Sequence, residues 1–488
     1  MDIPLEKQYV SKEKYDKICS DYENLKFQLD QLQRVLYGKR TERFIPAIDG
    51  QIDLFTETAL EESQGEQTKT ISYTRGIAPK KKKKPIRMVL PSHLPRVTEI
   101  IEPKDKEPGA KKIGEQITEI LEYNPANIFV RQIIRPKYTK ANGQGVLIAE
   151  MPSLPLPKAN AGPGMLAHIC VSKFIDHLPF YRQIQILKRQ NLIISPSTMG
   201  DWFNGTCKLI SPLFEALQSQ VLHNADYLQA DESPIKVQDN HKKDALHQGY
   251  MWLFRNPKNK LVLFNYDKGR SRKLPEKVLM NFTGMLQTDG YRVYQALDTK
   301  GEITLLGCMA HARRYFEKAL SNDNNRASHA LKQIQLLYLI EQKVRDRGIN
   351  VKTIKRYRQL YAVPILEELK KWLDLNSFKV LPKSAIGTAI AYTLNIYQNL
   401  RRYVLEGNYE IDNNNIENAV RPLALGRKNY LFAGSHKAAQ NIAMMYSFFA
   451  SCKANDVNPY NWLENVLSTI QEHKVNKLQE LLPNNWKL

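Results

Sequence analysis

The stretch "YLQADESPIKV", from Tyr227 to Val237, decides the expected fold of this chain of 488 residues. It is a short apolar run with aromatic and β-branched residues, which is typical of a strand, and Asp231 lies midway along it. Two similar segments follow, "GYMWLF" and "KLVLFNY", and the turn sequence "RNPKN" separates them. We therefore expect three antiparallel strands, the last two of which form a hairpin.

Beyond these strands the pattern alternates between helix and strand. "SRKLPEKVL" is helical, "GMLQTDGYRVY" is a buried strand that ends at Asp289, and "ITLLGCMAHARRYFEKAL" repeats the change from strand to helix. This is the element order of an RNase H-like mixed sheet, and the fold class we expect is therefore multidomain α/β. The first and fourth strands are neighbours in that topology, so Asp231 and Asp289 should lie side by side at its working edge.

Two neighbouring buried carboxylates repel each other unless a cation joins them. Hard oxygen ligands with room for water and phosphate suit Mg²⁺, or alternatively Mn²⁺. The five cysteines are scattered without a CxxC pair, which argues against a disulfide framework and against a cysteine-based zinc site. A third acid would complete a site for two metal ions of the kind that acts on phosphodiesters.

Glu417 is the candidate for that third acid. It lies in "IDNNNIENAVRPLALGRKNYLF", where the three asparagines favour a helix cap and indicate that a helix begins within their run. Arg421 and Lys428 share a helical face with Glu417. Pro422 predicts a kink or an early end. A solvated pair of Glu417 and Arg421 is the alternative interpretation of this segment.

Asp412 is the competing third acid, but it precedes the helix and suits a capping role better. Asp289 and Glu417 are 128 residues apart, a separation too long for a direct connection. An inserted helical subdomain over about 322–405 is therefore expected, because "SHALKQIQLLYLIEQKVRDR" and "YAVPILEELKKWLDL" in this interval are strongly helical.

The chain is strongly basic, with 71 Lys plus Arg against 50 Asp plus Glu and a formal charge of +21. This excess predicts a polyanionic partner or an anionic surface. The segment "PKKKKKP" suits an extended tether along phosphates or a solubilising linker, and its candidate DNA-binding residues are Lys80, Lys81, Lys82, Lys83 and Lys84. The sequence contains neither an 18-residue apolar run nor an N-terminal signal pattern, so we expect a soluble intracellular protein without a membrane partner.

The remaining segments predict smaller modules around the sheet. Apolar residues from Tyr15 to Leu36 follow a heptad pattern, which favours self-association through a coiled coil at 1–44, or else one helix that packs on its own domain. The other predicted parts are a flexible basic linker at 45–88, a small β-rich module at 89–160, a helix-turn-helix-like DNA-binding region at 161–222, the catalytic domain at 223–452 and a helical tail at 453–488.

Several blocks of this sequence resemble those of insertion-sequence transposases of the IS66 family, a branch of the DDE transposases. They include "ADESPIKV", "TDGYRVY", "CMAHARRYF", "IDNNNIENAVRPLALGRKNYLFAGS", "LYGKRTERF", "SKFIDHLPFYRQ" and "NPYNWLENVL". The resemblance covers nearly the whole chain. It implies that Asp231, Asp289 and Glu417 are the metal-binding triad, and that the protein cleaves DNA at inverted terminal repeats and joins the ends to target DNA. It also implies small accessory proteins as partners and a location in the bacterial cytoplasm at the nucleoid.

The basic residues near these acids are candidates for contact with DNA. His311 and Arg314 begin the helix after the fifth strand, and they would bind phosphates or steady the scissile group. Arg421, Arg427 and Lys428 follow Glu417 and would face incoming DNA. The β-rich module departs from the family's zinc finger because it lacks paired cysteines.

Two other functions suit the same sequence. One is a structure-selective nuclease of RNase H-like fold that cuts without joining. The other is a domesticated DNA-binding protein without catalysis, although the presence of all three carboxylates argues against it.

Overall fold

The computed structural model describes residues 128, 137–139, 146–148, 153–157, 159–239, 246–298 and 301–487. The chain divides into two compact units, one of Ile48–Met151 and one that combines Met1–Ala47 with Pro152–Leu488. In the smaller unit, β1 (Lys137–Thr139) pairs antiparallel with β2 (Val146–Ile148). The predicted coiled coil at 1–44 and the lysine run at 80–84 lie outside the described residues.

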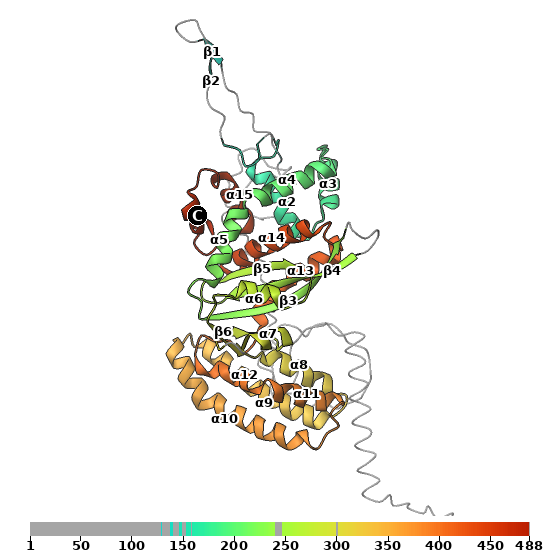
Figure 1. Cartoon of the computed structure of the whole chain (residues 1–488), viewed down its shortest axis with the longest axis vertical. Coiled ribbons are helices and arrows are strands. Elements are labelled where there is room, and N and C mark those ends of the chain that lie inside the picture. Colours follow the sequence, from blue (N-terminus) through green and yellow to red (C-terminus); the bar gives the residue numbers. More distant parts are fainter. Residues whose placement is uncertain are drawn as a thin grey trace, which may run out of the picture. The chain divides into compact units, whose positions relative to one another are not determined.

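A five-stranded mixed sheet forms the centre of the larger unit (Figure 1). Its strand order is β5-β4-β3-β6-β7. Strands β3, β4 and β5 are antiparallel, whereas β6 and β7 run parallel to β3. The expected pairing of the first and fourth strands is confirmed as the pair β3–β6. The strands are β3 (Tyr227–Gln238), β4 (Leu246–Asn256), β5 (Leu261–Asp267), β6 (Gly284–Gln287) and β7 (Ile303–Leu306).

The predicted hairpin between the second and third strands of the sheet is present. Asn256 ends β4, and its side-chain oxygen accepts the backbone N–H groups of Lys258 and Asn259 at 3.0 and 3.4 Å. Lys260 then takes a positive φ of 54° immediately before β5. The turn chemistry of "RNPKN" therefore reverses the chain locally.

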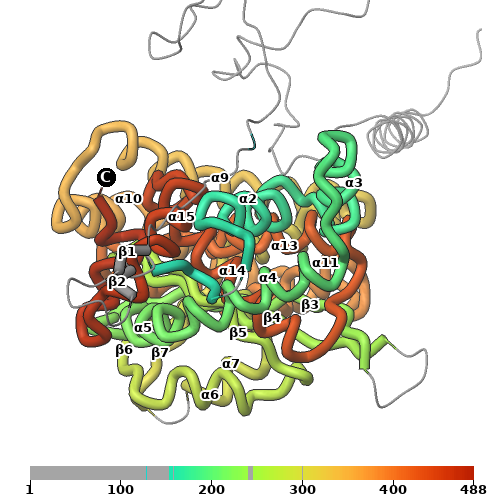
Figure 2. Tube along the Cα trace, turned by 90° about the horizontal axis from the view of Figure 1, so that it is seen from above, coloured from blue at the N-terminus to red at the C-terminus, as the bar shows by residue number. Residues whose placement is uncertain are grey.

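Helices before and after the sheet in sequence share one hydrophobic core with its strands. Trp252 and Phe264 of the sheet are fully buried in that core, together with Phe448. Figure 2 shows the helices of residues 163–209 beside those of residues 436–469. The helices are α2 (Pro163–Phe174), α3 (Phe180–Arg189), α4 (Pro196–Leu209), α5 (Ser211–Leu222), α14 (His436–Ala454) and α15 (Pro459–Thr469), followed by the 3₁₀ helix η2 (Val475–Leu481).

Strand β5 forms one edge of the sheet, and α14 lies against it. The Ser447 hydroxyl oxygen accepts the N–H of Phe264 at 2.7 Å, and that of Ser451 accepts the N–H of Val262 at 2.9 Å. Both serines are fully buried. Side chains of a helix therefore satisfy backbone donors that a neighbouring strand would otherwise take.

The pattern of two helices within "HLPFYRQIQILKRQNLIISPSTMGDWFNG" is confirmed as α3 and α4. Between them, Asn191 takes a positive φ of 60°, which separates the two helices. Ser195 caps α4 because its hydroxyl accepts the N–H of Thr198 at 3.0 Å, and Pro196 takes the first helical position, where a missing N–H costs nothing.

Between β7 and the helix of Glu417 the chain forms a helical layer with a second hydrophobic core (Figure 1). The region 322–405 is mostly helical, as its periodicity predicts. A buried ion pair joins two of its helices, with Arg358 Nη2 at 2.7 Å from Glu341 Oε2. The helices are α8 (Met309–Ala319), α9 (Asn324–Asp346), α10 (Val351–Ser377), α11 (Ala385–Asn395), α12 (Tyr397–Arg401) and the 3₁₀ helix η1 (Arg402–Leu405).

Two short helices, α6 (Lys273–Val278) and α7 (Arg292–Asp298), alternate with the later strands as expected. None of the helices in the described part of the chain combines the length and the apolar character that crossing a membrane requires.

Candidate active site

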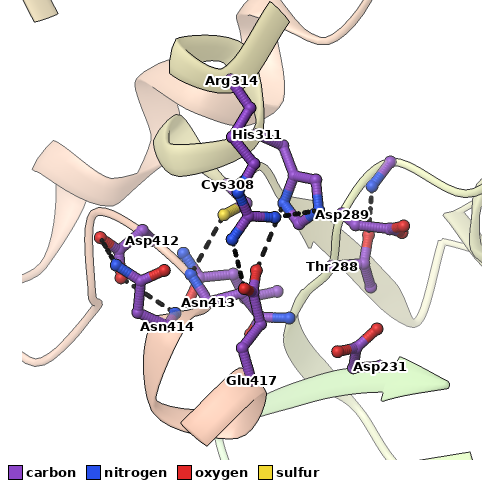
Figure 3. A network of polar contacts seen from close by, with 12 residues as sticks. Asp231, Thr288, Asp289, Cys308, His311, Arg314, Asp412, Asn413, Asn414 and Glu417 are labelled. Carbon is purple, nitrogen blue, oxygen red and sulfur yellow. Dashed lines mark hydrogen bonds and ion pairs between the residues drawn. The ribbon is translucent and has the colours of Figure 1, made fainter. Parts of the chain in front are cut away.

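Asp231 lies on β3, and Asp289 lies two residues beyond the end of the neighbouring parallel strand β6. The pairing of β3 with β6 aligns Gln229 with Gln287, and each aspartate follows its glutamine by two residues. Asp231 Oδ1 accepts the N–H of Glu232 at 2.8 Å, and Asp289 Oδ1 accepts the N–H of Tyr291 at 2.8 Å. The structure thus brings the two aspartates together near the carboxyl end of β6 beside the central strand β3, as the strand order predicts (Figure 3).

The helix of Glu417, α13 (Asn414–Tyr430), lies along β3 and is bonded to it at both ends. At its start, Asn413 Nδ2 donates to the carbonyl of Ala230 at 2.9 Å, next to Asp231. After its end, Ala433 N donates to the carbonyl of Lys236 at 2.8 Å and forms an isolated bridge with Val237. These bonds hold Glu417 beside the strand that carries Asp231.

Two details of α13 correct the expectations from sequence. The sequence predicted a kink or an early end at Pro422, and the early end was wrong, because the helix continues to Tyr430. Packing favours this continuation, because Leu423, which follows the proline, is fully buried in the core. Asn413 is the N-cap residue, yet its side chain bonds to β3 and makes no capping bond.

Asp412 has the capping role instead. Its Oδ1 accepts the N–H of Asn414, the first residue of α13, at 3.0 Å. Its Oδ2 accepts the hydroxyl of Tyr338 at 2.8 Å, and its side chain is buried. The expected preference of Asp412 for the first turn of the helix is confirmed.

Glu417 contacts two of the basic residues that the sequence singled out. Arg314 Nη2 donates to Glu417 Oε2 in a short ion pair, and His311 Nδ1 lies 3.7 Å from Glu417 Oε1. Figure 3 shows that the Glu417 carboxylate points toward these side chains of α8, while Asp231 lies to one side. The guanidinium of Arg314 therefore pairs with Glu417 in this structure and is not directed only at solvent.

The other predicted cations have different positions. Arg421 and Lys428 are exposed on α13. Arg427 Nη1 donates to Ser233 Oγ at 2.9 Å and to the carbonyl of Pro234, so its side chain helps to fix α13 on β3.

The electrostatics of the site are dominated by carboxylates. Burial raises the pKa of Asp231 well above its usual value, and the charges of Glu232 and Asp289 raise it further. Burial also raises the pKa of Glu232, against the bond from Arg270. Crowded acids of this kind are stabilised by a cation that neutralises them.

Glu232 and its partners are the part of the site that sequence reasoning missed. Arg270 Nη2 lies 2.5 Å from Glu232 Oε1, and the Tyr294 hydroxyl donates to Glu232 Oε2 at 3.3 Å. The Arg270 guanidinium stacks 4.0 Å from the ring centre of Tyr291. The adjacent acids in "ADESP" were a signal for Glu232, whereas nothing local indicated Arg270.

A buried polar network lies beneath the two aspartates. Gln287 Oε1 accepts from Gln229 Nε2 at 2.9 Å and from the Tyr227 hydroxyl at 2.5 Å. Gln287 Nε2 donates to the carbonyls of Gly307 at 3.0 Å and Glu410 at 2.8 Å. One amide thus connects β3, β6, the end of β7 and the segment that leads into α13.

Carboxylate oxygens are the ligands that a hard divalent cation prefers. Asp231, Asp289 and Glu417 offer carboxylate oxygens, and Glu417 Oε1 is buried without a hydrogen-bond partner. A different set, Cys308, His311 and Glu417, has ligand atoms within 4.8 Å of one another, and sequence reasoning did not anticipate it. Burial raises the pKa of the Cys308 thiol to about 12, and the Arg314 cation lies beside the same site. Among the described residues, only the Cys308 set brings its ligand atoms this close together, whereas Asp231, Asp289 and Glu417 offer harder ligands without forming such a cluster.

Known families match most of the chain. The model described as Transposase IS66 family matches residues 158–441, and the IS66 C-terminal element matches residues 447–484. A third model, Transposase C of IS166 homeodomain, matches residues 24–98, which lie outside the described residues.

Similar proteins occur in Sinorhizobium fredii strain NGR234. The uncharacterized protein y4jD is 32% identical over 424 residues, which cover 82% of this chain and 81% of the relative. The uncharacterized protein y4qI is 30% identical over 488 residues, with 95% of this chain and 89% of the relative covered. The uncharacterized protein y4hP is 28% identical over 495 residues, with 95% and 88% covered.

Proposed function

We propose, from the premise that this chain belongs to the IS66 transposase family, that it cleaves DNA at the inverted terminal repeats of an insertion sequence and joins the cut strands to a target. The observation that supports this most is the placement of Asp231 on β3 and of Asp289 two residues beyond the end of the neighbouring strand β6, with Glu417 on a helix bonded along β3. The strand order β5-β4-β3-β6-β7 agrees with the RNase H-like topology that we expect from the order of elements.

In this proposal Asp231, Asp289 and Glu417 hold two Mg²⁺ ions, or Mn²⁺ in their place. Bound ions of this kind supply activation of an attacking oxygen and stabilisation of the leaving oxygen at a phosphodiester. Arg314 fixes the orientation of Glu417 through its ion pair. Arg421 and Lys428 are exposed on the same helix and would meet DNA phosphates.

The proposed partners are the element ends and the target DNA. Copies of the chain would associate through residues 1–44, and small proteins from the same element would assist. The family model that is named for a homeodomain adds support for DNA binding near the N-terminus. The lysines at 80–84 would contribute phosphate contacts.

The test replaces each aspartate with asparagine. Asp231→Asn and Asp289→Asn should each abolish cleavage and joining yet leave DNA affinity near normal, because the basic surface is intact. Asp267→Asn is the matched control, since Asp267 also accepts an N–H two residues ahead, from Gly269 at 2.7 Å, but lies on the edge strand β5. If either site variant keeps one tenth of wild-type joining, the assignment is refuted. A tenfold loss corresponds to only about 1.4 kcal/mol of transition-state stabilisation, far too little for the loss of a metal ligand.

Pre-cut element ends separate this function from its two alternatives. A structure-selective nuclease on the same fold would cut DNA but would not join such ends to a target. A silent DNA-binding protein would bind the ends without either reaction, and its binding would be the same with or without Mg²⁺.

A further inference from the structure

An aromatic cleft lies beside the C-terminal end of α13, away from the carboxylates. Its volume is about 250 Å³. Helices α2 and α4 and the segment that joins α13 to α14 contribute to its walls. The lining includes the side chains of Lys173, Phe180, Phe203, Tyr430 and Phe432.

Lys173 is a cation among rings in this cleft. Its Nζ lies 3.6 Å from the ring centre of Phe180, 5.6 Å from that of Phe203 and 5.9 Å from that of Tyr430. Within the described residues, Lys173 makes no ion pair with a carboxylate. Burial lowers the pKa of its ammonium group to about 8. The aromatic faces offset part of the cost of burying this charge, and an oxygen atom with negative charge would offset more.

The cleft has the features of a site for a flat, polar ring. Tyr430 and Phe432 are the lining rings that are partly exposed without Lys173 directly over them, and such rings suit stacking against any nucleobase, because every base has a π face. The exposed Asn204 adds an amide at the rim. Arg182 Nη1 donates to Asn429 Oδ1 at 3.0 Å near the end of α13, and Lys437 is exposed in the first turn of α14 next to the lining residue Ala438, so the surroundings favour an anionic strand.

We propose that this cleft takes one unstacked nucleobase of a DNA strand, with the base against the rings and a base carbonyl or phosphate oxygen at Lys173 Nζ. The choice of DNA rests on the proposed function. Glu417 and Tyr430 are thirteen residues apart on α13, which corresponds to about 20 Å along the helix. At about 3.4 Å per base pair, the captured base lies roughly six base pairs from the cleavage point.

The test compares two DNA duplexes that differ only by a single unpaired thymine. Fluorescence anisotropy with the full chain in EDTA measures affinity without any cleavage step. The wild-type chain should bind the bulged duplex about fivefold more tightly or better, because stacking of one base is worth about 1 kcal/mol or more.

Two variants alter the cleft from different sides. Gly200→Leu should fill it, since a Cβ at Gly200 meets no atom within 4 Å, and leucine also favours helix α4. Phe432→Ala removes a wall residue that is 38% exposed. Both should bring the ratio of the two affinities close to one, with affinity for the paired duplex unchanged within about twofold.

Leu431→Ala is the control, because Leu431 is 63% exposed and is not part of the lining. It should keep the wild-type preference for the bulge. Equal wild-type affinity for the two duplexes, or a preference that survives both Gly200→Leu and Phe432→Ala, overturns the cleft proposal and leaves the proposed function standing. A wild-type chain that binds neither duplex overturns both.

Discussion

Replacing Gln287 with leucine should separate the three segments that carry the candidate acids. Gln287 is fully buried and its amide makes the four hydrogen bonds described above. Leucine has a similar volume, so the main loss is polar and no large cavity forms. The carbonyls of Gly307 and Glu410 lose a donor, and the hydroxyl of Tyr227 loses its acceptor.

Each buried polar group that loses its partner costs about 1–3 kcal/mol. Gln229 adds little to this cost, because its Nε2 still donates to Glu410 Oε2 at 2.8 Å. Three groups at the low end of that range lower the free energy of unfolding by about 3 kcal/mol. Because Asp289 follows two residues later and Glu410 leads into α13, small shifts of the acids should also slow joining by about tenfold to a hundredfold.

Urea denaturation followed by circular dichroism measures the loss of stability, and strand transfer at a temperature where the variant stays folded measures the loss of joining. Gln333→Leu is the control, because Gln333 is buried in α9 and donates a single bond of 3.3 Å, to Glu368. It should cost less than about 1 kcal/mol and leave joining intact. If Gln287→Leu unfolds within about 0.5 kcal/mol of the wild type and joins at the same rate, the network does not position the acids.

Three further outcomes are expected. Glu417→Gln should abolish joining in Mg²⁺, whereas Asp412→Asn should keep joining and lose about 1 kcal/mol of stability. Thermal melting and strand-transfer assays test both variants. An inactive but fully stable Asp412→Asn variant, together with an active Glu417→Gln variant, would make Asp412 the third ligand. DNA affinity should fall steeply as salt rises, because phosphate contacts release counter-ions, and a flat salt dependence would indicate a different partner. Deletion of residues 1–44 should lower the oligomeric mass in light scattering, while an unchanged mass would assign the helix predicted there to the surface of its own chain.

The parts of the fold that depend on local patterns could be predicted from the sequence. The strand around Asp231, the hairpin after β4 and the cap of α4 by Ser195 follow from residue types within a few positions. The pairing of β3 with β6 required one further step, the choice of topology from the order of elements.

The remaining details depend on contacts between distant residues. The partner of Asn413 is Ala230, 183 residues earlier, and the partner of Arg427 is Ser233, 194 residues earlier. From local sequence alone, Asn413 was expected to cap the helix and Arg427 to contact DNA. No residue near them in the sequence indicates their partners on β3. Glu232 was overlooked for a related reason, since alternation along a strand directs it to the face opposite Asp231.

The bonds from Ser447 and Ser451 to β5 have a consequence for how copies of this protein can meet. An open strand edge invites a second chain to extend the sheet, which is a common route to domain exchange and to fibrils. Here Val262 and Phe264 already give their outward N–H groups to α14. A second copy would have to break these buried bonds before it could add a strand at β5, so this edge is protected from the strand pairing that leads to domain exchange or to fibrils.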